Sequence, residues 1–226
     1  MKRILTFVPA AVLALAALSP SPAAAQAPAA GAAAEPAAPA AAGKEKLVDI
    51  SKVDINIQKT PQIQATNVKD KRWTPKDWIE IEVEATAELS KTEKDKSRKT
   101  YDEVTFKYYA YLTGSSAKKS RVLTGEIVHV NVPIKEKIHS VAYITPSQLQ
   151  KVTEATATGP ANPTMVKAWG VQVLIDGQEV GRKTSDSNKE WWSNPSLPPQ
   201  EAALLNKADT PFAPLWGDFH LEIKPR

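Results

Sequence analysis

A strict alternation of apolar and polar positions is the clearest pattern in this sequence. From Trp78 to Leu89 every second residue is apolar, and most of the residues between are glutamates. A period of two is typical of a β-strand with one buried face and one solvated face. A row of glutamates without a histidine or metal-ligand partner nearby indicates a solvated face rather than a catalytic carboxylate cluster. The predicted buried face contains Ile79, Ile81, Val83, Ala85, Ala87 and Leu89.

Short apolar or alternating runs recur along the rest of the chain, separated by turn residues. Asp176-Gly177 lies between two of them and is the strongest hairpin signal, because a type I′ turn needs positive φ at both central positions. Seven or eight short strands predict an all-β fold, an immunoglobulin-like antiparallel β-sandwich. The predicted strands are Val53–Ile57, Trp78–Leu89, Val104–Leu112, Arg121–Val132, Ile138–Ile144, Val166–Ile175, Gln178–Lys183 and Phe219–Ile223.

Helical signals are few and short. Thr145 followed by Pro146 and Gln148 has the pattern of a helix N-cap, which predicts a surface helix over Pro146–Thr153. A second short helix, entered at proline, is predicted over Pro198–Lys207.

The first part of the chain has a different composition. Met1-Lys2-Arg3 precedes an apolar run, Ile4–Leu18, and small residues end at Ala25, before Gln26. This order predicts a cleaved Sec signal peptide over residues 1–25. Residues 26–43 are rich in alanine and proline and predict a disordered linker, which leaves residues 44–226 as a single domain. Export would place the protein in the periplasm, on the outer envelope surface or in the medium.

Composition and charge narrow the classes of function. The chain has 226 residues, no cysteine and a formal net charge of +4. Disulfide frameworks, thiolate metal sites and cysteine nucleophiles are therefore excluded. Basic and acidic residues are nearly balanced and interspersed, so nucleic acid is not an expected partner.

The search for catalytic motifs finds little. His129, His139 and His220 lie far apart and have no metal-ligand spacing, so no metal is expected. The sequence has no G-x-S-x-G, no H-E-x-x-H and no glycine-rich phosphate loop. We therefore expect a protein that is not an enzyme and has no cofactor. A hydrolase is the third alternative, after a protein-interaction role and a glycan-binding module.

Two segments are candidate partner-binding sites. Trp191 and Trp192 are adjacent in a polar loop, and on a strand their rings would point to opposite faces. They could cover the open end of the sandwich or contact a protein. The alternative function is a glycan-binding module, in which Trp192, or Tyr109 and Tyr111, would stack on a sugar ring.

The second candidate is the first predicted strand, which follows the linker. Val53, Ile55 and Ile57 alternate with polar residues there. Such a strand could be donated to the sheet edge of a neighbouring protein.

Several of these features together resemble a known family. They are the leader, the Ala/Pro spacer, the hairpin from Trp169 to Gly177, the Glu190-Trp191-Trp192 motif and the segment Thr210–Leu215. The combination resembles a small family of exported verrucomicrobial proteins, described as pilus-like and linked to a type IV pilus-like gene cluster, with immunoglobulin-like domains akin to archaeal pilins. The resemblance spans most of residues 44–226.

The resemblance implies a structural or accessory role in a pilus-like or adhesive surface assembly, with protein partners and self-association. It brings no catalytic residues. One departure from type IV pilins matters, because the apolar run here carries no acid and ends at a signal-peptidase site. An accessory or surface-associated role therefore fits better than filament formation by the usual pilin route.

Overall fold

The computed structural model describes residues 45–63, 66–69, 71–114, 120–153, 161–187, 189–198 and 200–226. The predicted signal peptide and linker lie outside these residues, so both stay predictions. Within the described residues the chain is an all-β sandwich, as the alternating pattern predicts.

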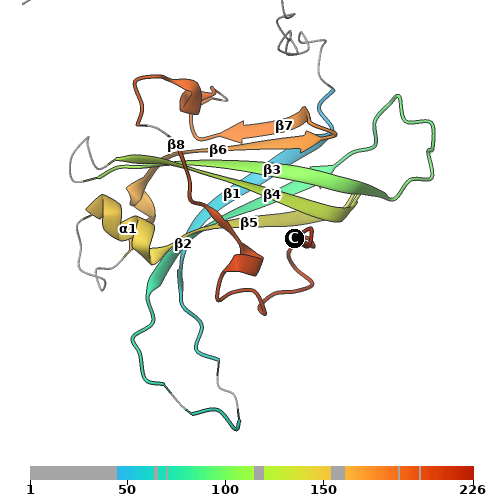
Figure 1. Cartoon of the computed structure of the whole chain (residues 1–226). Helices are drawn as coiled ribbons and strands as arrows, with labels where there is room; N and C mark the ends of the chain where they lie inside the picture. The colour runs from blue at the N-terminus through green and yellow to red at the C-terminus, as the bar shows by residue number, and fades with distance from the viewer. Residues whose placement is uncertain are drawn as a thin grey trace, which may run out of the picture. The chain divides into compact units, whose positions relative to one another are not determined.

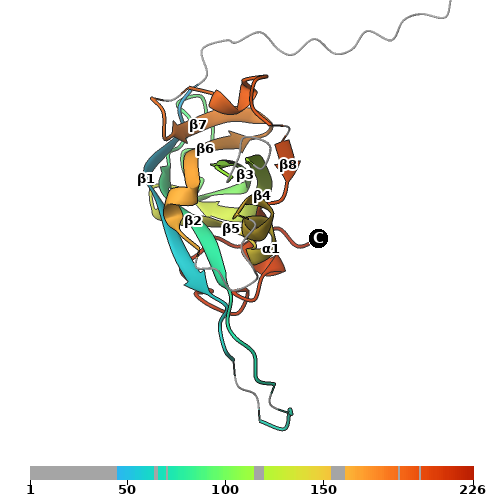
Figure 2. The same ribbon diagram turned by 90° about the vertical axis from the view of Figure 1, so that its left-hand side faces the viewer.

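Two sheets face each other (Figures 1 and 2). The four-stranded sheet has the order β1 (Val48–Lys59), β2 (Asp77–Ala87), β5 (Lys137–Ile144) and β9 (Leu205–Asn206). The five-stranded sheet has the order β7 (Gln178–Thr184), β6 (Val166–Ile175), β3 (Thr100–Leu112), β4 (Arg121–Pro133) and β8 (Gln200–Ala202). Neighbouring strands are antiparallel, except that β8 runs parallel to β4.

The strand order is that of an immunoglobulin-like fold. The chain changes sheet between β2 and β3, between β4 and β5, between β5 and β6, and between β8 and β9. The order β1-β2-β5 against β7-β6-β3-β4 corresponds to strands A-B-E and G-F-C-C′ of that fold. The predicted fold class is confirmed.

The core lies between the sheets and is built from the alternating positions. The predicted inner face of β2 is buried from Ile79 to Ala87, and Leu89, beyond the end of the strand, is partly buried. β3 supplies the facing layer with Val104, Phe106, Tyr108, Ala110 and Leu112, each at most 1% exposed.

The α-helix α1 spans Pro146–Thr153, as predicted, and the Gln148 amide donates to Oγ1 of Thr145 at 3.2 Å. The described residues also contain three 3₁₀ turns: η2 (Pro163–Met165), η3 (Trp191–Ser193) and η4 (Lys207–Asp209). Among the residues that the structure describes, no helix is long and apolar enough to cross a membrane.

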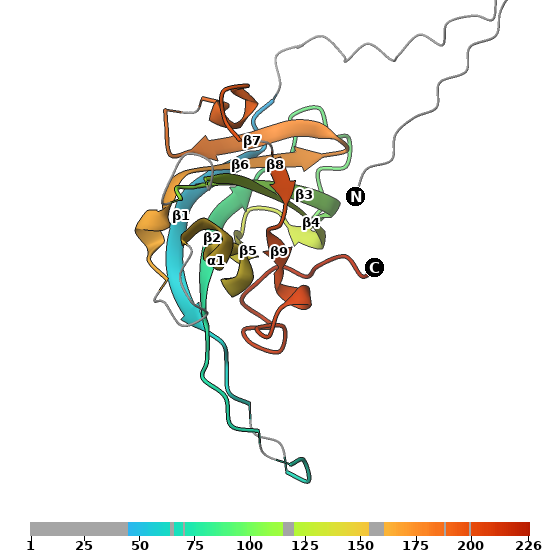
Figure 3. The same cartoon turned by 60° about the vertical axis from the view of Figure 1, so that its left-hand side comes forward.

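The prediction of a helix over Pro198–Lys207 is wrong. Gln200–Ala202 instead pairs with β4 as β8, Leu205–Asn206 pairs with β5 as β9, and η4 follows (Figure 3). The amides of Ala203 and Leu204 both donate to the carbonyl of Thr124. The open edges of the two sheets supply backbone partners that override a weak local helix preference.

The predicted final strand over Phe219–Ile223 is also wrong. Phe219 and His220 lie in turns, and only Ile223 forms a bridge, to His129. The ring of Phe219 instead stacks on His139, with centroids 4.0 Å apart. The backbone divides its hydrogen bonds between two strands: the Leu221 amide donates to the His139 carbonyl of β5, and the Glu222 carbonyl accepts from the Val130 amide of β4, so no regular ladder forms with either.

The chain leaves the sandwich between β1 and β2. The connection Thr60–Lys76, here called the arm, projects away from both sheets (Figures 1–3). Its base is closed by the Thr60 amide, which donates to the Lys76 carbonyl at 2.9 Å.

Candidate functional site: an acidic and aromatic cleft

The outer face of the four-stranded sheet is covered by the segment Lys207–Ile223, here called the C-terminal segment. Phe212, 1% exposed, stacks on Tyr143 of β5 with centroids 4.7 Å apart and rings 8° from parallel. The ring of Trp78 meets Phe212 edge-on at 5.6 Å. This cover corrects the prediction of a solvated glutamate face, because Glu80 is only 3% exposed.

A cleft of about 280 Å³ is lined by residues of β1, β2 and the C-terminal segment. Two carboxylates form one wall and aromatic rings form the other. Its lining residues are Gln58, Glu80, Glu82, Trp216, Phe219 and His220.

Glu80 is fixed in place by two hydrogen bonds. Nε2 of Gln58 donates to Oε1 at 3.1 Å, and the Tyr143 hydroxyl donates to Oε2 at 2.8 Å. Burial, and then the charge of Glu80, raise the pKa of the Tyr143 hydroxyl above its ordinary value, which keeps it a donor. A buried carboxylate needs such partners.

Glu82 lies two residues further along the same face of β2. Its Oε1 is 3.1 Å from Nδ1 of His139. Burial, and then the charge of Glu80, raise the pKa of the Glu82 carboxyl above its ordinary value, while His139 acts in the opposite sense. The two carboxylates therefore repel each other in a poorly solvated place, and a cation in the cleft would offset that repulsion.

The neighbouring acids on this face are already neutralised. Glu84 pairs with Lys137 at 3.2 Å and Asp54 pairs with Lys52 at 2.7 Å. Within the described residues, neither cleft glutamate forms an ion pair with a lysine or arginine: Glu80 is held by Gln58 and Tyr143, and Glu82 has the imidazole of His139 beside it.

Trp216 has an unusual backbone. Its φ is +52°, in the left-handed region, which costs a bulky residue about 1–3 kcal/mol. Its carbonyl accepts hydrogen bonds from Nζ of Lys207 at 3.1 Å, the Phe219 amide at 3.2 Å and the His220 amide at 3.3 Å. Three donors thus hold a strained turn at the cleft, and strain of this kind concentrates at functional sites.

The aromatic wall is open to solvent. Trp216 is 45% exposed and Phe219 is 50% exposed. Burial, and then the charge of Lys207, lower the pKa of the His220 imidazole to about 4, so it is neutral at pH 7. Neutral aromatic rings opposite carboxylates are the arrangement that binds an ammonium or guanidinium group.

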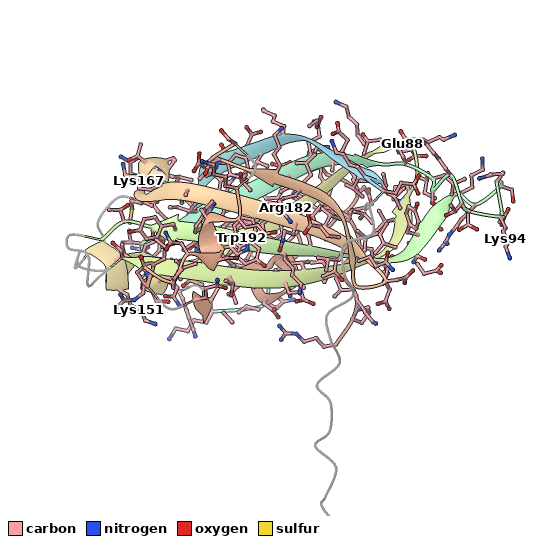
Figure 4. All side chains as sticks on the ribbon, turned by 90° about the horizontal axis from the view of Figure 1, so that it is seen from above. Glu88, Lys94, Lys151, Lys167, Arg182 and Trp192 are labelled. Atoms are coloured by element: carbon pink, nitrogen blue, oxygen red, sulfur yellow. The ribbon has the colours of Figure 1, made fainter. Side chains whose placement is uncertain are left out.

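The structure places Trp191 and Trp192 on the outer face of the five-stranded sheet. They lie in η3, so their rings do not point to opposite faces of a strand, and neither covers the open end of the sandwich. Trp192, 7% exposed, stacks on Tyr109 at 4.2 Å, and Nε1 of Trp191 donates to the Trp169 carbonyl at 3.2 Å. Figure 4 labels Trp192 and also Arg182 of β7, which forms an ion pair with Glu190, the residue before η3. No ring face of Trp192 is left open for a sugar.

Val53, Ile55 and Ile57 belong to β1 and pair with Val83, Ile81 and Ile79 of β2. Val53 and Ile55 pack partly buried against the core of their own domain, and Ile57 is 36% exposed. The predicted donor strand is thus already used within its own sheet. Its other long edge carries no strand in the described sheet.

The three histidines are not brought together into a metal site, and the described residues contain no group of three or more acidic or histidine side chains suited to one. His129 lies in the interior, where Nε2 is 2.6 Å from Oγ of Ser140. The Tyr108 hydroxyl donates to the same oxygen at 2.7 Å. Ser140 is 0% exposed and His129 is 1% exposed, so no substrate reaches this hydroxyl.

The sequence alone does not predict that the cleft residues come together. Trp216 lies in a segment without periodicity, Phe219 begins the alternating run that predicts a strand, and no local signal places either residue opposite Glu80 and Glu82 of β2. The arm carries a clearer signal, because 17 residues without a strand pattern, with Pro61 and Pro75 each one residue from its ends, exceed the usual connection length.

An immunoglobulin-like β-sandwich with an acidic and aromatic cleft on one outer face is the class of protein that the structure defines. A protein-family model matches residues 39–226, and the chain belongs to that family. The chain is also similar to a crystal structure of a protein from Akkermansia muciniphila, at 27% identity and a TM-score of 0.67. The match covers 80% of this chain and 94% of that one. No curated protein matches the sequence.

The similarity to a protein of this verrucomicrobial bacterium agrees with the verrucomicrobial part of the resemblance noted in the sequence.

Proposed function

We propose that this protein is an exported, non-enzymatic interaction protein that acts through protein–protein contacts. Its place would be in a type IV pilus-like or adhesive surface assembly, as a component or an accessory. The family match and the similarity to the Akkermansia protein support a verrucomicrobial surface role, and the leader-like start of the chain supports export.

The observation that carries the proposal is the location of exposed apolar side chains. Six large apolar residues are exposed among those that the structure describes. Three lie on the arm, two line the cleft, and one lies near the end of β1, just before the arm. These are Ile63, Val68, Trp73, Trp216, Phe219 and Ile57. Exposed apolar groups that gather in this way mark interaction sites.

A glycan-binding role has less support. Trp192 and Tyr109 cover each other, and the ring of Tyr111 lies 6.4 Å from that of Trp191. A glycan array that gave binding sensitive to Trp192→Ala, with the fold intact, would favour this alternative instead.

Site-specific cross-linking in the producing cell tests the proposal. A photoreactive phenylalanine analogue replaces Trp73 on the arm. A matched variant carries it at Lys167, in β6 of the five-stranded sheet (Figure 4). We expect protein adducts in envelope fractions from position 73 and few from position 167. Equal labelling at both positions, or no adducts from position 73, would contradict the proposal.

Export has its own measurement. Cell fractionation combined with N-terminal sequencing should find the protein outside the cytoplasm, with Gln26 as its first residue. An intact N-terminus in the cytoplasmic fraction would refute that part.

A further inference from the structure

The arm is rich in basic residues. It contains Lys69, Lys71, Arg72 and Lys76 against a single acid, Asp70. Between its base residues, Thr60 and Lys76, none of the described arm residues forms a hydrogen bond or ion pair with another described residue. Trp73, next to Arg72, is 49% exposed.

The cleft has the complementary properties. Glu80 and Glu82 supply two negative charges without a lysine or arginine partner among the described residues, and Trp216 and Phe219 supply open ring faces. An arginine satisfies both walls, because its guanidinium pairs with carboxylates and stacks on aromatic rings. A phosphate, a sulfate or another anion would meet the wrong charge here.

We propose that the cleft receives Arg72 from the arm of a second copy of this chain, so that copies join head to tail. The inference rests on the proposed function, because it names one partner of the interacting surfaces described above. Trp73 would pack beside Trp216 and Phe219 at the rim, which covers apolar surface that is exposed in one copy alone.

The contact has a definite symmetry. The arm and the cleft are different surfaces, so the interface is heterologous, and the pair formed by the first contact keeps one free arm, on one copy, and one free cleft, on the other. Repetition gives a ring if the rotation closes and an open chain if it does not. An open chain of domains is what a pilus-like assembly requires.

Sedimentation velocity on protein produced from the full-length sequence tests the inference. We expect concentration-dependent association that weakens as sodium chloride is raised, because charges make the contact. Arg72→Glu and Glu82→Gln should each weaken association by at least about tenfold. Lys94→Glu, a matched charge change on the exposed loop between β2 and β3 (Figure 4), should leave it unchanged.

Mixing the two variants gives a result that misfolding cannot imitate. Arg72→Glu keeps an intact cleft and Glu82→Gln keeps an intact arm, so an equimolar mixture should form heterodimers and nothing larger. A mixture that stays monomeric, variants that associate like the wild type, or a wild-type protein that is monomeric at all concentrations would overturn the inference. If the protein is monomeric while position 73 still cross-links to another protein in cells, the proposed function stands and self-association alone fails.

Discussion

Trp192 lies flat on Tyr109, with ring centroids 4.2 Å apart and planes 5° from parallel. The tryptophan belongs to η3, after β7, and the tyrosine belongs to the outer face of β3. The contact therefore closes a loop over the five-stranded sheet of its own domain. The Nε2 atom of Gln200 donates to the Trp192 carbonyl at 2.9 Å and ties the same loop to β8.

Trp192→Ala should destabilise the domain. The ring is 7% exposed, and removal of a buried large aromatic ring costs about 3–5 kcal/mol, with values toward the lower end at a site near solvent. Chemical denaturation of both proteins measures the difference in the free energy of unfolding. Trp73→Ala removes the same side chain from an exposed site on the arm and should change stability by less than about 0.5 kcal/mol. Similar losses for the two variants would contradict this account of Trp192.

Gly170→Ala should destabilise through the same ring. A Cβ atom at Gly170 would lie 2.2 Å from Cζ3 of Trp192, so the ring or the strand must move, at about 1–3 kcal/mol. A double-mutant cycle isolates this clash. In the Trp192→Ala background the cost of Gly170→Ala should nearly disappear, and an additive cycle would rule out the clash as its cause.

The strands and the turns could be predicted from the sequence because their signals are local. The period of two in β2 and β3 specifies which residues face the core, and Thr145 marks the start of α1. The turn Asp176-Gly177 has φ of +51° and +73°, as a type I′ turn requires. Each of these signals lies within the element that it predicts.

Gly177→Ala measures how much glycine at this turn position contributes to the free energy of unfolding. A Cβ at Gly177 meets nothing within 4 Å, so the cost comes from the left-handed backbone alone, about 1–2 kcal/mol. Gly217 also has open space around its Cα, and its φ lies outside the left-handed region. Gly217→Ala is the matched control and should be neutral or slightly stabilising. Equal losses of unfolding free energy in the two variants would contradict this interpretation.

The cleft could not be predicted because its two walls are far apart in the chain. The alternating pattern predicts that Glu80 is solvated, but the C-terminal segment covers it in the folded protein. That cover depends on Phe212 packing on Tyr143. Gln200–Ala202 illustrates the same limit, since the open edge of β4 decides its conformation. Tertiary partners, which a local pattern does not contain, set both outcomes.

The role of β1 can be tested with a covalent lock. Val53 lies directly opposite Val83 in the antiparallel pair, where Cα atoms are about 4.5–5.5 Å apart, a span that a disulfide bridges. We expect that Val53→Cys with Val83→Cys, once oxidised, associates and cross-links as the wild type does, because β1 stays in its own sheet. If oxidation abolishes association and reduction restores it, β1 is instead donated to a neighbour.

His129 should make stability fall in acid. Burial lowers the pKa of its imidazole to about 4, against about 6.5 in the unfolded chain. The unfolded state therefore binds a proton that the folded state excludes between these values. The contribution of the neutral imidazole to the free energy of unfolding is complete above about pH 6.5. It is lost as pH falls and no longer changes below about pH 4. The loss over this window is about 3 kcal/mol.

The measurement is the free energy of unfolding against pH for the wild type and His129→Gln. The variant starts from lower stability because it loses hydrogen bonds in the interior, but its curve should be flatter between pH 6.5 and 4. Glu82, whose raised pKa acts with the opposite sign, is present in both proteins and cancels in the difference. An NMR titration of the wild type provides a check that does not depend on the variant folding. If the His129 imidazole titrated near 6.5, the native interior would admit its charged form, and parallel stability curves would follow.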